Sequence, residues 1–289
     1  RTHKPEVSGS IPLPATTFMN ELLKNFKSSP RYSIKWSNYF DIYKDLLSPY
    51  KNKKITLVEI GIGDGGSLHM WKSFLNNKSK VIGIDLNPDA KRLEKEGFKI
   101  FIGDQSKKSF WRNFYKKIGK VDVIIDDGGH TNLQQITTFV ESVNFIKDGG
   151  LIITEDTHTS FMKKKGFNNP SSYSLVRFSS SIVENLHRRN PNIDKKLNIF
   201  SKKIYSIEYF DSIVAFKIDQ KKCKITKNLE NNKKLRNFFT DYRFKKDRNK
   251  TKENSRIFNF FEKNFSKRSL PYKIYERFLI KKYYQFIKK

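Results

Sequence analysis

Short apolar runs alternate with amphipathic stretches through the middle of the chain. The runs, each expected to be a strand, cover residues 55–62, 80–85, 99–102, 121–126 and 151–155. The stretches between them predict helices over residues 67–75, 88–96, 109–117 and 133–146. Short apolar strands separated by helices indicate a parallel sheet covered on both faces, which right-handed crossovers make doubly wound. The expected fold class is therefore α/β and Rossmann-like.

The pattern changes on both sides of this region. Residues 1–16 are polar and read as an extended arm, and helices are expected around residues 18–26 and 36–47. After a helix near residues 175–186, two β-rich runs, 198–209 and 212–218, are separated only by Phe210 and Asp211. We expect these runs to form an antiparallel hairpin that closes the mostly parallel sheet.

Three regions follow from these patterns. Residues 1–53 are an N-terminal arm with helices, residues 54–220 are the α/β domain, and residues 221–289 are a basic, aromatic-rich extension that we expect to be helical. The extension holds 23 Lys and Arg against 6 Asp and Glu, a net charge of +17 within the chain total of +29. Such a segment packs on the domain with a solvated basic face, binds an anionic membrane surface or binds nucleic acid, in that order of preference.

Composition narrows the class of protein. A hydrophobic content of 37% and an aromatic content of 14% exclude a wholly disordered chain. The single cysteine, Cys223, cannot form an intrachain disulfide or a cysteine-based zinc site, and it fits a reducing compartment. Because no apolar run reaches about 18 residues, we expect a cytoplasmic protein, peripheral to the inner face of the membrane through its extension. A homo-oligomer is compatible with the sequence.

A glycine-rich segment leaves the first expected strand and enters a helix. Its spacing, Gly61-x-Gly63-x-x-Gly66, lets the backbone turn sharply and approach a ligand. Asp85, at the end of the next strand, is placed to bind ribose hydroxyls. This motif alone does not separate nicotinamide cofactors from S-adenosylmethionine (SAM).

Three further features favour SAM. Glu59 lies two positions before the first glycine, polar residues 103–106 follow the third strand, and a hairpin closes the sheet. The residues expected to bind the cofactor are Glu59, Gly61, Gly63, Gly65, Ser67, Asp85, Asp104, Gln105 and Asp126.

Two pairs of acidic residues end neighbouring strands. Asp126 and Asp127 follow one buried strand, and Glu155 and Asp156 follow the next, so both pairs meet at the carboxyl edge of the sheet. Clustered carboxylates repel unless a cation neutralises them, and their oxygens suit Mg²⁺ or another divalent ion. His130 is then placed to act as a general base. Alternatively, Asp127 and Glu155 cap helices and His130 only packs.

At this point the chain resembles a known group. Its motifs Glu59-x-Gly61-x-Gly63-x-Gly65, 103–106, 126–130, 155–160 and 209–214 look like those of the metal-dependent sugar O-methyltransferases of macrolide biosynthesis, of the mycinamicin and tylosin type, and of cephalosporin-pathway relatives. The resemblance covers about residues 30–220. It implies that Asp127, Glu155 and Asp156 ligate Mg²⁺ and that His130 is the base, although Gly129 replaces the usual serine.

The resulting hypothesis is a SAM- and metal-dependent O-methyltransferase that acts on a sugar hydroxyl. The acceptor is expected to be a cell-surface polysaccharide of capsule or lipopolysaccharide type, its precursor, or a glycosylated metabolite. Alternatives are a phenol or catechol O-methyltransferase, a nucleic-acid-binding methyltransferase, a non-catalytic scaffold and a nicotinamide-dependent dehydrogenase. The sequence lacks an Asn-Pro-Pro-Tyr-like base-methylation motif, which disfavours the nucleic-acid-binding methyltransferase, and Glu59 and the hairpin disfavour the dehydrogenase.

Overall fold

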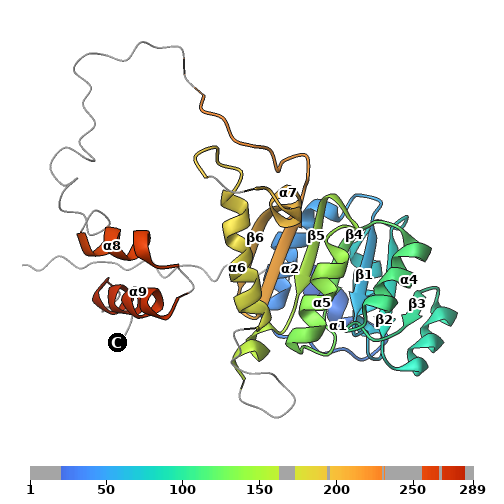
Figure 1. The fold of residues 1–289 in the computed structure, drawn as a ribbon. Coiled ribbons are helices and arrows are strands. Elements are labelled where there is room, and N and C mark those ends of the chain that lie inside the picture. The colour runs from blue at the N-terminus through green and yellow to red at the C-terminus, as the bar shows by residue number, and fades with distance from the viewer. Residues whose placement is uncertain are drawn as a thin grey trace, which may run out of the picture. The chain divides into compact units, whose positions relative to one another are not determined.

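The computed structural model describes residues 21–162, 173–193, 196–229, 231, 256–266 and 269–283. The predicted arm, residues 1–16, and residues 232–255 of the basic extension lie outside these residues. The chain divides into two compact units, Arg1–Lys227 and Asn228–Lys289 (Figure 1).

Within the described residues of the first unit, seven strands form one sheet in the order β3-β2-β1-β4-β5-β7-β6. The strands are β1 (Thr56–Ile60), β2 (Lys80–Asp85), β3 (Lys99–Ile102), β4 (Val121–Asp126), β5 (Ile146–Thr154), β6 (Ile204–Phe210) and β7 (Ile213–Ile218). Strands β1 to β5 are parallel, and β7 is antiparallel to both β5 and β6. This confirms the predicted doubly wound sheet with a closing hairpin.

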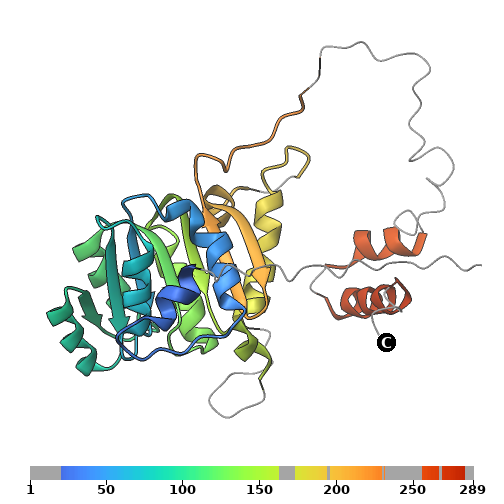
Figure 2. The ribbon, with the colours of Figure 1, turned by 180° about the vertical axis from the view of Figure 1, so that it is seen from behind.

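Helices cover both faces of the sheet because successive strand residues point to opposite sides. On one face, Val123 and Ile125 of β4 pack with α1 (Glu21–Lys27), α2 (Tyr39–Leu47) and α3 (Gly66–Phe74). On the other face, Ile124 packs with α4 (Lys108–Ile118), α5 (Asn132–Ser142) and α6 (Leu175–His187). Figure 1 shows the face of α4, α5 and α6, and Figure 2 shows the face of α1 and α2.

Three predicted elements differ from the structure. Residues 88–96 form a 3₁₀ segment, η2 (Pro88–Glu96), whose buried side chains, Ala90 and Leu93, are spaced by three residues as 3₁₀ geometry favours. The helix predicted to reach residue 146 ends at Ser142 because Ile146 pairs with Val121 and begins β5. The run 198–209 begins with helix α7 (Ile199–Lys203) because Asn198 caps it by accepting a hydrogen bond from Ser201 N. Two further short 3₁₀ segments are η1 (Ser48–Tyr50) and η3 (Thr157–Phe161).

The second unit contains the helices expected in the extension, α8 (Arg256–Asn264) and α9 (Leu270–Tyr283). They pair through aromatic rings: Phe261 stacks on Tyr275 with centroids 4.3 Å apart, and Tyr275 is buried. Ile274 and Phe278 on α9 remain exposed. None of the described helices has the length and apolar character needed to cross a membrane.

Candidate active site

The loop after β1 turns through three glycines with positive φ, Gly61 (80°), Gly63 (53°) and Gly65 (96°). Gly61 also lies against the backbone of the loop after β4, so closely that a Cβ atom on it would be 2.0 Å from the carbonyl oxygen of Asp127. Only glycine combines this conformation with this approach. The first predicted cofactor loop and the acidic loop therefore pack directly on each other.

Asp85, at the end of β2, holds the shape of the glycine loop. Its Oδ2 atom accepts hydrogen bonds from the backbone N–H groups of Ile62 (3.0 Å) and Gly63 (3.1 Å), and its Oδ1 atom accepts one from Asn87 N. The carboxylate is thus positioned by three backbone donors before any ligand is considered.

A cavity of about 230 Å³ opens at the carboxyl edge of the sheet. It is lined by Ile60, Gly61, Asp85, Leu86, Gly103, Asp104, Gln105, Gly128, Gly129 and Gln134. Apart from Gln134 of α5, these residues come from the ends of β1, β2, β3 and β4, where open α/β sheets bind ligands. Four of the predicted cofactor residues, Gly61, Asp85, Asp104 and Gln105, line this cavity.

Glu59 and Ser67 do not line the cavity but lie buried beneath the loop. Glu59 is completely buried and its Oε2 atom accepts a hydrogen bond of 2.7 Å from Ser67 Oγ. Burial raises the pKa of the Glu59 carboxyl group. Gly63 and Gly65 also lie outside the lining, so their evident role is the course of the loop.

Asp126 acts on the site through Gln105. The buried Asp126 Oδ1 atom accepts hydrogen bonds from Gln105 Nε2 (2.8 Å) and Gly128 N (3.3 Å), and Gln105 Oε1 accepts one from Gly129 N (3.1 Å). Burial raises the pKa of Asp126. This pair fixes the loop that carries Asp127 and His130 against the loop after β3.

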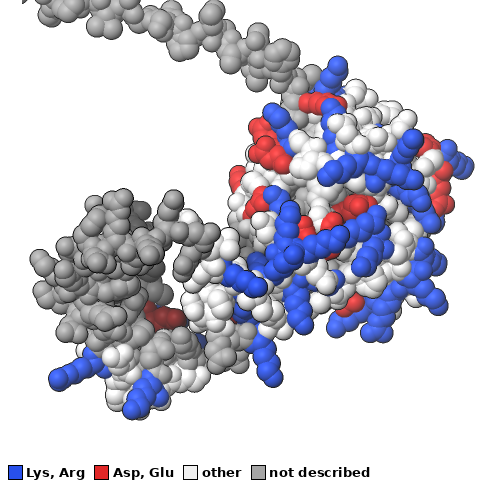
Figure 3. Space-filling view, turned by 90° about the horizontal axis from the view of Figure 1, so that it is seen from above, with Lys and Arg blue, Asp and Glu red and all other residues white. Residues whose placement is uncertain are grey.

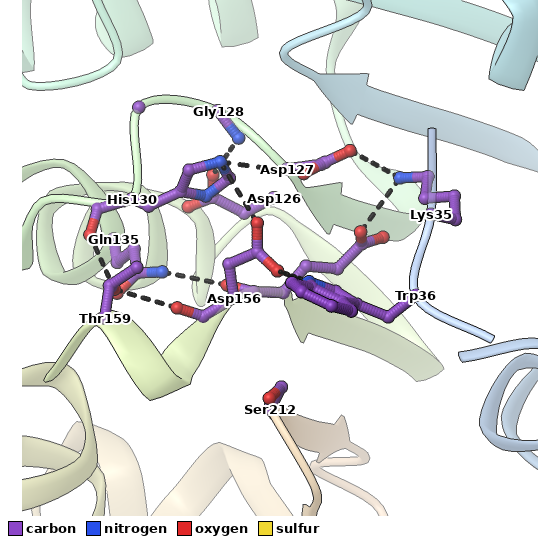
Figure 4. A network of polar contacts seen from close by, with 12 residues as sticks. Lys35, Trp36, Asp126, Asp127, Gly128, His130, Gln135, Asp156, Thr159 and Ser212 are labelled. Carbon is purple, nitrogen blue, oxygen red and sulfur yellow. Dashed lines mark hydrogen bonds and ion pairs between the residues drawn. The ribbon is translucent and has the colours of Figure 1, made fainter. Parts of the chain in front are cut away.

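Asp127, His130 and Asp156 converge beside the cavity (Figure 4). His130 Nε2 is 3.8 Å from Asp127 Oδ1 and 3.3 Å from Asp156 Oδ2, and one ligand atom from each of the three residues lies within 4.8 Å of the other two. The two carboxylates at this spacing suit a small divalent cation, and the imidazole beside them is placed to be either a further ligand or a base.

The backbone at this cluster is strained. His130 (φ 56°) and Asp156 (φ 52°) both adopt the left-handed conformation, as does the nearby Ser212 (φ 64°). Non-glycine residues hold this conformation only when their surroundings stabilise it, and such residues gather at functional sites. The strained backbone and the clustered side chains therefore indicate the same functional site.

The N-terminal segment positions Asp156. Its Oδ1 atom accepts hydrogen bonds from Tyr39 Oη (2.6 Å) and from Trp36 Nε1 (3.1 Å). The Trp36 ring meets that of His158 edge to face, with centroids 5.9 Å apart. Neither Trp36 nor Tyr39 was expected at the site from the sequence.

Glu155 faces away from the cluster. It is completely buried, its Oε2 atom is 2.8 Å from Lys35 Nζ, and its Oε1 atom accepts a hydrogen bond from Tyr43 Oη. Burial first, and then the charge of Asp127, raise its pKa well above the usual range. Its predicted role as a ligand remains a prediction. The sequence alone did not identify Lys35 as a site residue, because it is one of the 58 Lys and Arg residues of the chain.

The balance of charges at the site fits the binding of a divalent cation. Four carboxylates lie in this region: those of Glu59, Asp127 and Glu155 surround Lys35, and that of Asp156 contacts His130. Among the described residues, the ammonium of Lys35 is the single buried ammonium that faces them. Buried carboxylates in excess of their cations are costly, so the donor set favours additional positive charge.

Comparison with known proteins finds O-methyltransferases that are similar to parts of this chain. The chain matches no protein-family profile. It is 31% identical over 165 residues to 8-demethyl-8-alpha-L-rhamnosyl tetracenomycin-C 2'-O-methyltransferase of Streptomyces olivaceus, covering 54% of this chain and 43% of the relative. It is 32% identical over 119 residues to mycinamicin VI 2''-O-methyltransferase of Micromonospora griseorubida, covering 39% of this chain and 29% of the relative. The chain thus spans less than half the length of these relatives.

A solved structure shares the fold. The MycE methyltransferase from the mycinamycin biosynthetic pathway, in complex with Mg and SAH, superposes with a TM-score of 0.60 at 21% identity, covering 69% of this chain and 54% of that chain. The chain therefore shares the fold of this methyltransferase, and part of its sequence is similar to the sugar O-methyltransferases that its motifs resemble.

Proposed function

We propose that this chain binds SAM and a divalent cation, Mg²⁺ by preference, and methylates a sugar hydroxyl. The observation that carries the proposal is the convergence of Asp127, His130 and Asp156 beside the cavity lined by Asp85 and Gln105. A cofactor in that cavity would lie next to a cation held by the carboxylates of Asp127 and Asp156. The sequence relatives, which are O-methyltransferases, support the same chemistry.

The described residues suit methyl transfer to a hydroxyl group. When bound, SAM supplies an electrophilic methyl group, and a divalent cation supplies charge that lowers the pKa of a neighbouring hydroxyl. With both bound, His130 Nε2 would accept the proton of the substrate hydroxyl, so that the hydroxyl oxygen could act as the nucleophile toward that methyl group. Asp127 and Asp156, 3.8 Å and 3.3 Å from that nitrogen, stabilise the imidazolium that results.

The proposal is tested by titrating SAM into the purified chain in a calorimeter, with Mg²⁺ and then with EDTA, and by measuring methyl transfer to sugar acceptors. We expect SAM binding, and a methyl transfer that EDTA abolishes and Mg²⁺ restores. Methyl transfer that persists in EDTA would keep the enzyme class and remove the metal from the mechanism. Absence of SAM binding would remove the function altogether.

Replacing His130 by glutamine should lower kcat by about a hundredfold to a thousandfold, because the hydroxyl loses its proton acceptor. The remaining rate should rise with pH, since hydroxide then removes the proton. Mn²⁺ binding, followed by electron paramagnetic resonance, should persist. A variant that loses Mn²⁺ binding together with activity would identify His130 as a ligand instead of a base. His187→Gln, on the exposed end of α6, is the matched control.

The class of methyl acceptor is determined by assaying methyl transfer to a panel of candidate acceptors. Glycosylated small molecules are supported by the names of the relatives, whereas lipid- or nucleotide-linked saccharide precursors are supported by the basic extension. Figure 3 shows Lys and Arg side chains spread over one face of the structure. Phenols and catechols complete the panel, because the metal and the base alone do not select a sugar. Methylation of phenols in preference to sugars would refute the sugar assignment.

The exposed surface of helix α9 supports binding of the chain to a membrane surface. Ile274 and Phe278 are exposed on α9, and Lys273 and Arg277 are exposed beside them. Apolar side chains flanked by cations favour adsorption to an anionic bilayer. The full chain should sediment with vesicles that contain phosphatidylglycerol, and Ile274→Glu with Phe278→Glu should reduce the bound fraction severalfold. Equal binding to neutral vesicles would contradict an electrostatic contribution.

A further inference from the structure

Lys35 is a buried cation in an otherwise exposed segment. Its side chain is 2% exposed, whereas Ile34 and Trp36 on either side are 75% and 58% exposed. Extended backbone alternates its side chains in this way, so Lys35 is directed into the protein while its neighbours face solvent.

The ammonium group lies among three carboxylates. Lys35 Nζ is 2.5 Å from Asp127 Oδ2, 2.8 Å from Glu155 Oε2 and 3.5 Å from Glu59 Oε1. Burial alone lowers the pKa of a lysine, yet these carboxylates raise the pKa of Lys35 well above its usual value. Three carboxylates within 3.5 Å stabilise the charged ammonium, which neutralises part of an acidic site that otherwise repels itself.

Asp127 is shared between this ammonium and the candidate metal cluster. Its Oδ2 atom contacts Lys35, and its Oδ1 atom faces His130. Figure 4 shows Lys35 on one side of the carboxylate, and His130 and Asp156 on the other. Two cations on one carboxylate repel each other strongly in surroundings of low dielectric constant.

We propose that Lys35 is the internal counter-cation of the unloaded site and that a divalent metal displaces it from Asp127 on binding. This inference rests on the proposed function. Lys35 is then a positioning residue that sets the metal affinity. Its displacement also frees Glu155 Oε2, which explains how Glu155 can be a ligand by motif and yet be paired with lysine in this structure.

The first test replaces Lys35 by methionine in the full chain and titrates Mn²⁺ alone, followed by electron paramagnetic resonance. We expect Mn²⁺ to bind about tenfold more tightly or better, because a competing charge is gone and the carboxylates repel one another more strongly. The metal-free variant should unfold at a lower temperature than wild type, and Mn²⁺ should raise its Tm by more. Lys35→Gln provides a second neutral variant if methionine prevents folding.

Matched controls separate this effect from the loss of any lysine. Lys147 Nζ is 2.8 Å from Asp122 Oδ2, far along β4 from the site, and Lys147→Met should leave Mn²⁺ affinity unchanged. A merely structural Lys35 predicts lower stability with unchanged or weaker Mn²⁺ binding, and that result would overturn the proposal.

The wild-type chain offers an independent readout. Acetic anhydride should acetylate Lys35 slowly without metal, because its side chain is 2% exposed, and severalfold faster with saturating Mn²⁺. The same labelling at Lys147 should not change. Unchanged labelling of Lys35 in the presence of bound Mn²⁺, or no Mn²⁺ binding by wild type and variants alike, overturns the displacement. Methyl transfer that continues in EDTA would then show that the proposed enzyme class survives without it.

Discussion

Replacing Asp127 by asparagine is expected to lower kcat/KM for methyl transfer by about a thousandfold or more. Asp127 contributes to both cation positions of the site, since its Oδ2 atom contacts Lys35 and its Oδ1 atom faces His130. The amide keeps the size of the side chain but removes the charge that both cations require. SAM binding in the cavity should change much less, because Asp127 does not line it.

Asp122→Asn is the matched control for this prediction. Asp122 lies on the same strand, β4, and its Oδ2 atom accepts hydrogen bonds from Thr56 N and from Lys147 Nζ at the opposite edge of the sheet. The control should therefore affect stability slightly and activity hardly at all. Near-normal activity of Asp127→Asn with bound SAM would show that the acidic cluster is not the catalytic centre.

The parts of the site that could be predicted all depend on strand ends. β4 and the second half of β5 are recognisable because most of their residues are buried on both faces and therefore apolar in sequence. Once two parallel strands are neighbours, their carboxyl ends meet, and Asp127 and Asp156 follow without knowledge of any other contact. Each acidic residue directly follows its strand in the sequence, so the hydrophobic pattern is enough to locate it.

The parts that could not be predicted come from contacts between distant segments. Lys35 reaches Glu155 across 120 positions of sequence, and Tyr39 reaches Asp156 across 117. No periodicity encodes such pairing. The role of Lys35 depends on the course of an extended segment that packs on the edge of the sheet, and that course is set by tertiary contacts alone.

This N-terminal segment connects the two halves of the site. Arg31 pairs with Asp64 of the glycine loop and with Glu96 of η2, and the backbone oxygen of Tyr32 accepts a hydrogen bond from Gly66 N. Hydrogen bonds from Arg31 and then His69 lower the pKa of Glu96 to about 2. A few residues further on, Lys35 reaches the acidic cluster. The glycine loop and the acidic cluster thus share one covering segment, in addition to the direct contact of their loops at Gly61.

Replacing Gly61 by alanine tests that direct contact and should be the most destabilising single change in the cofactor loop. A Cβ atom would lie 2.0 Å from Asp127 O and 2.7 Å from Gly128 Cα, and both are backbone atoms that cannot rotate away. The φ of 80° adds strain for any residue with a side chain. We expect a loss of about 3 kcal/mol or more in the free energy of unfolding, measured by urea denaturation.

Gly63→Ala isolates the steric part of this loss. Gly63 also has a positive φ, 53°, but nothing lies within 4 Å of the position of its Cβ atom. Its replacement should cost only about 1–2 kcal/mol, which is the conformational penalty alone. The difference between the two variants then measures how tightly the cofactor loop packs on the acidic loop. If Gly61→Ala cost no more than Gly63→Ala, the two loops would not be in contact in solution.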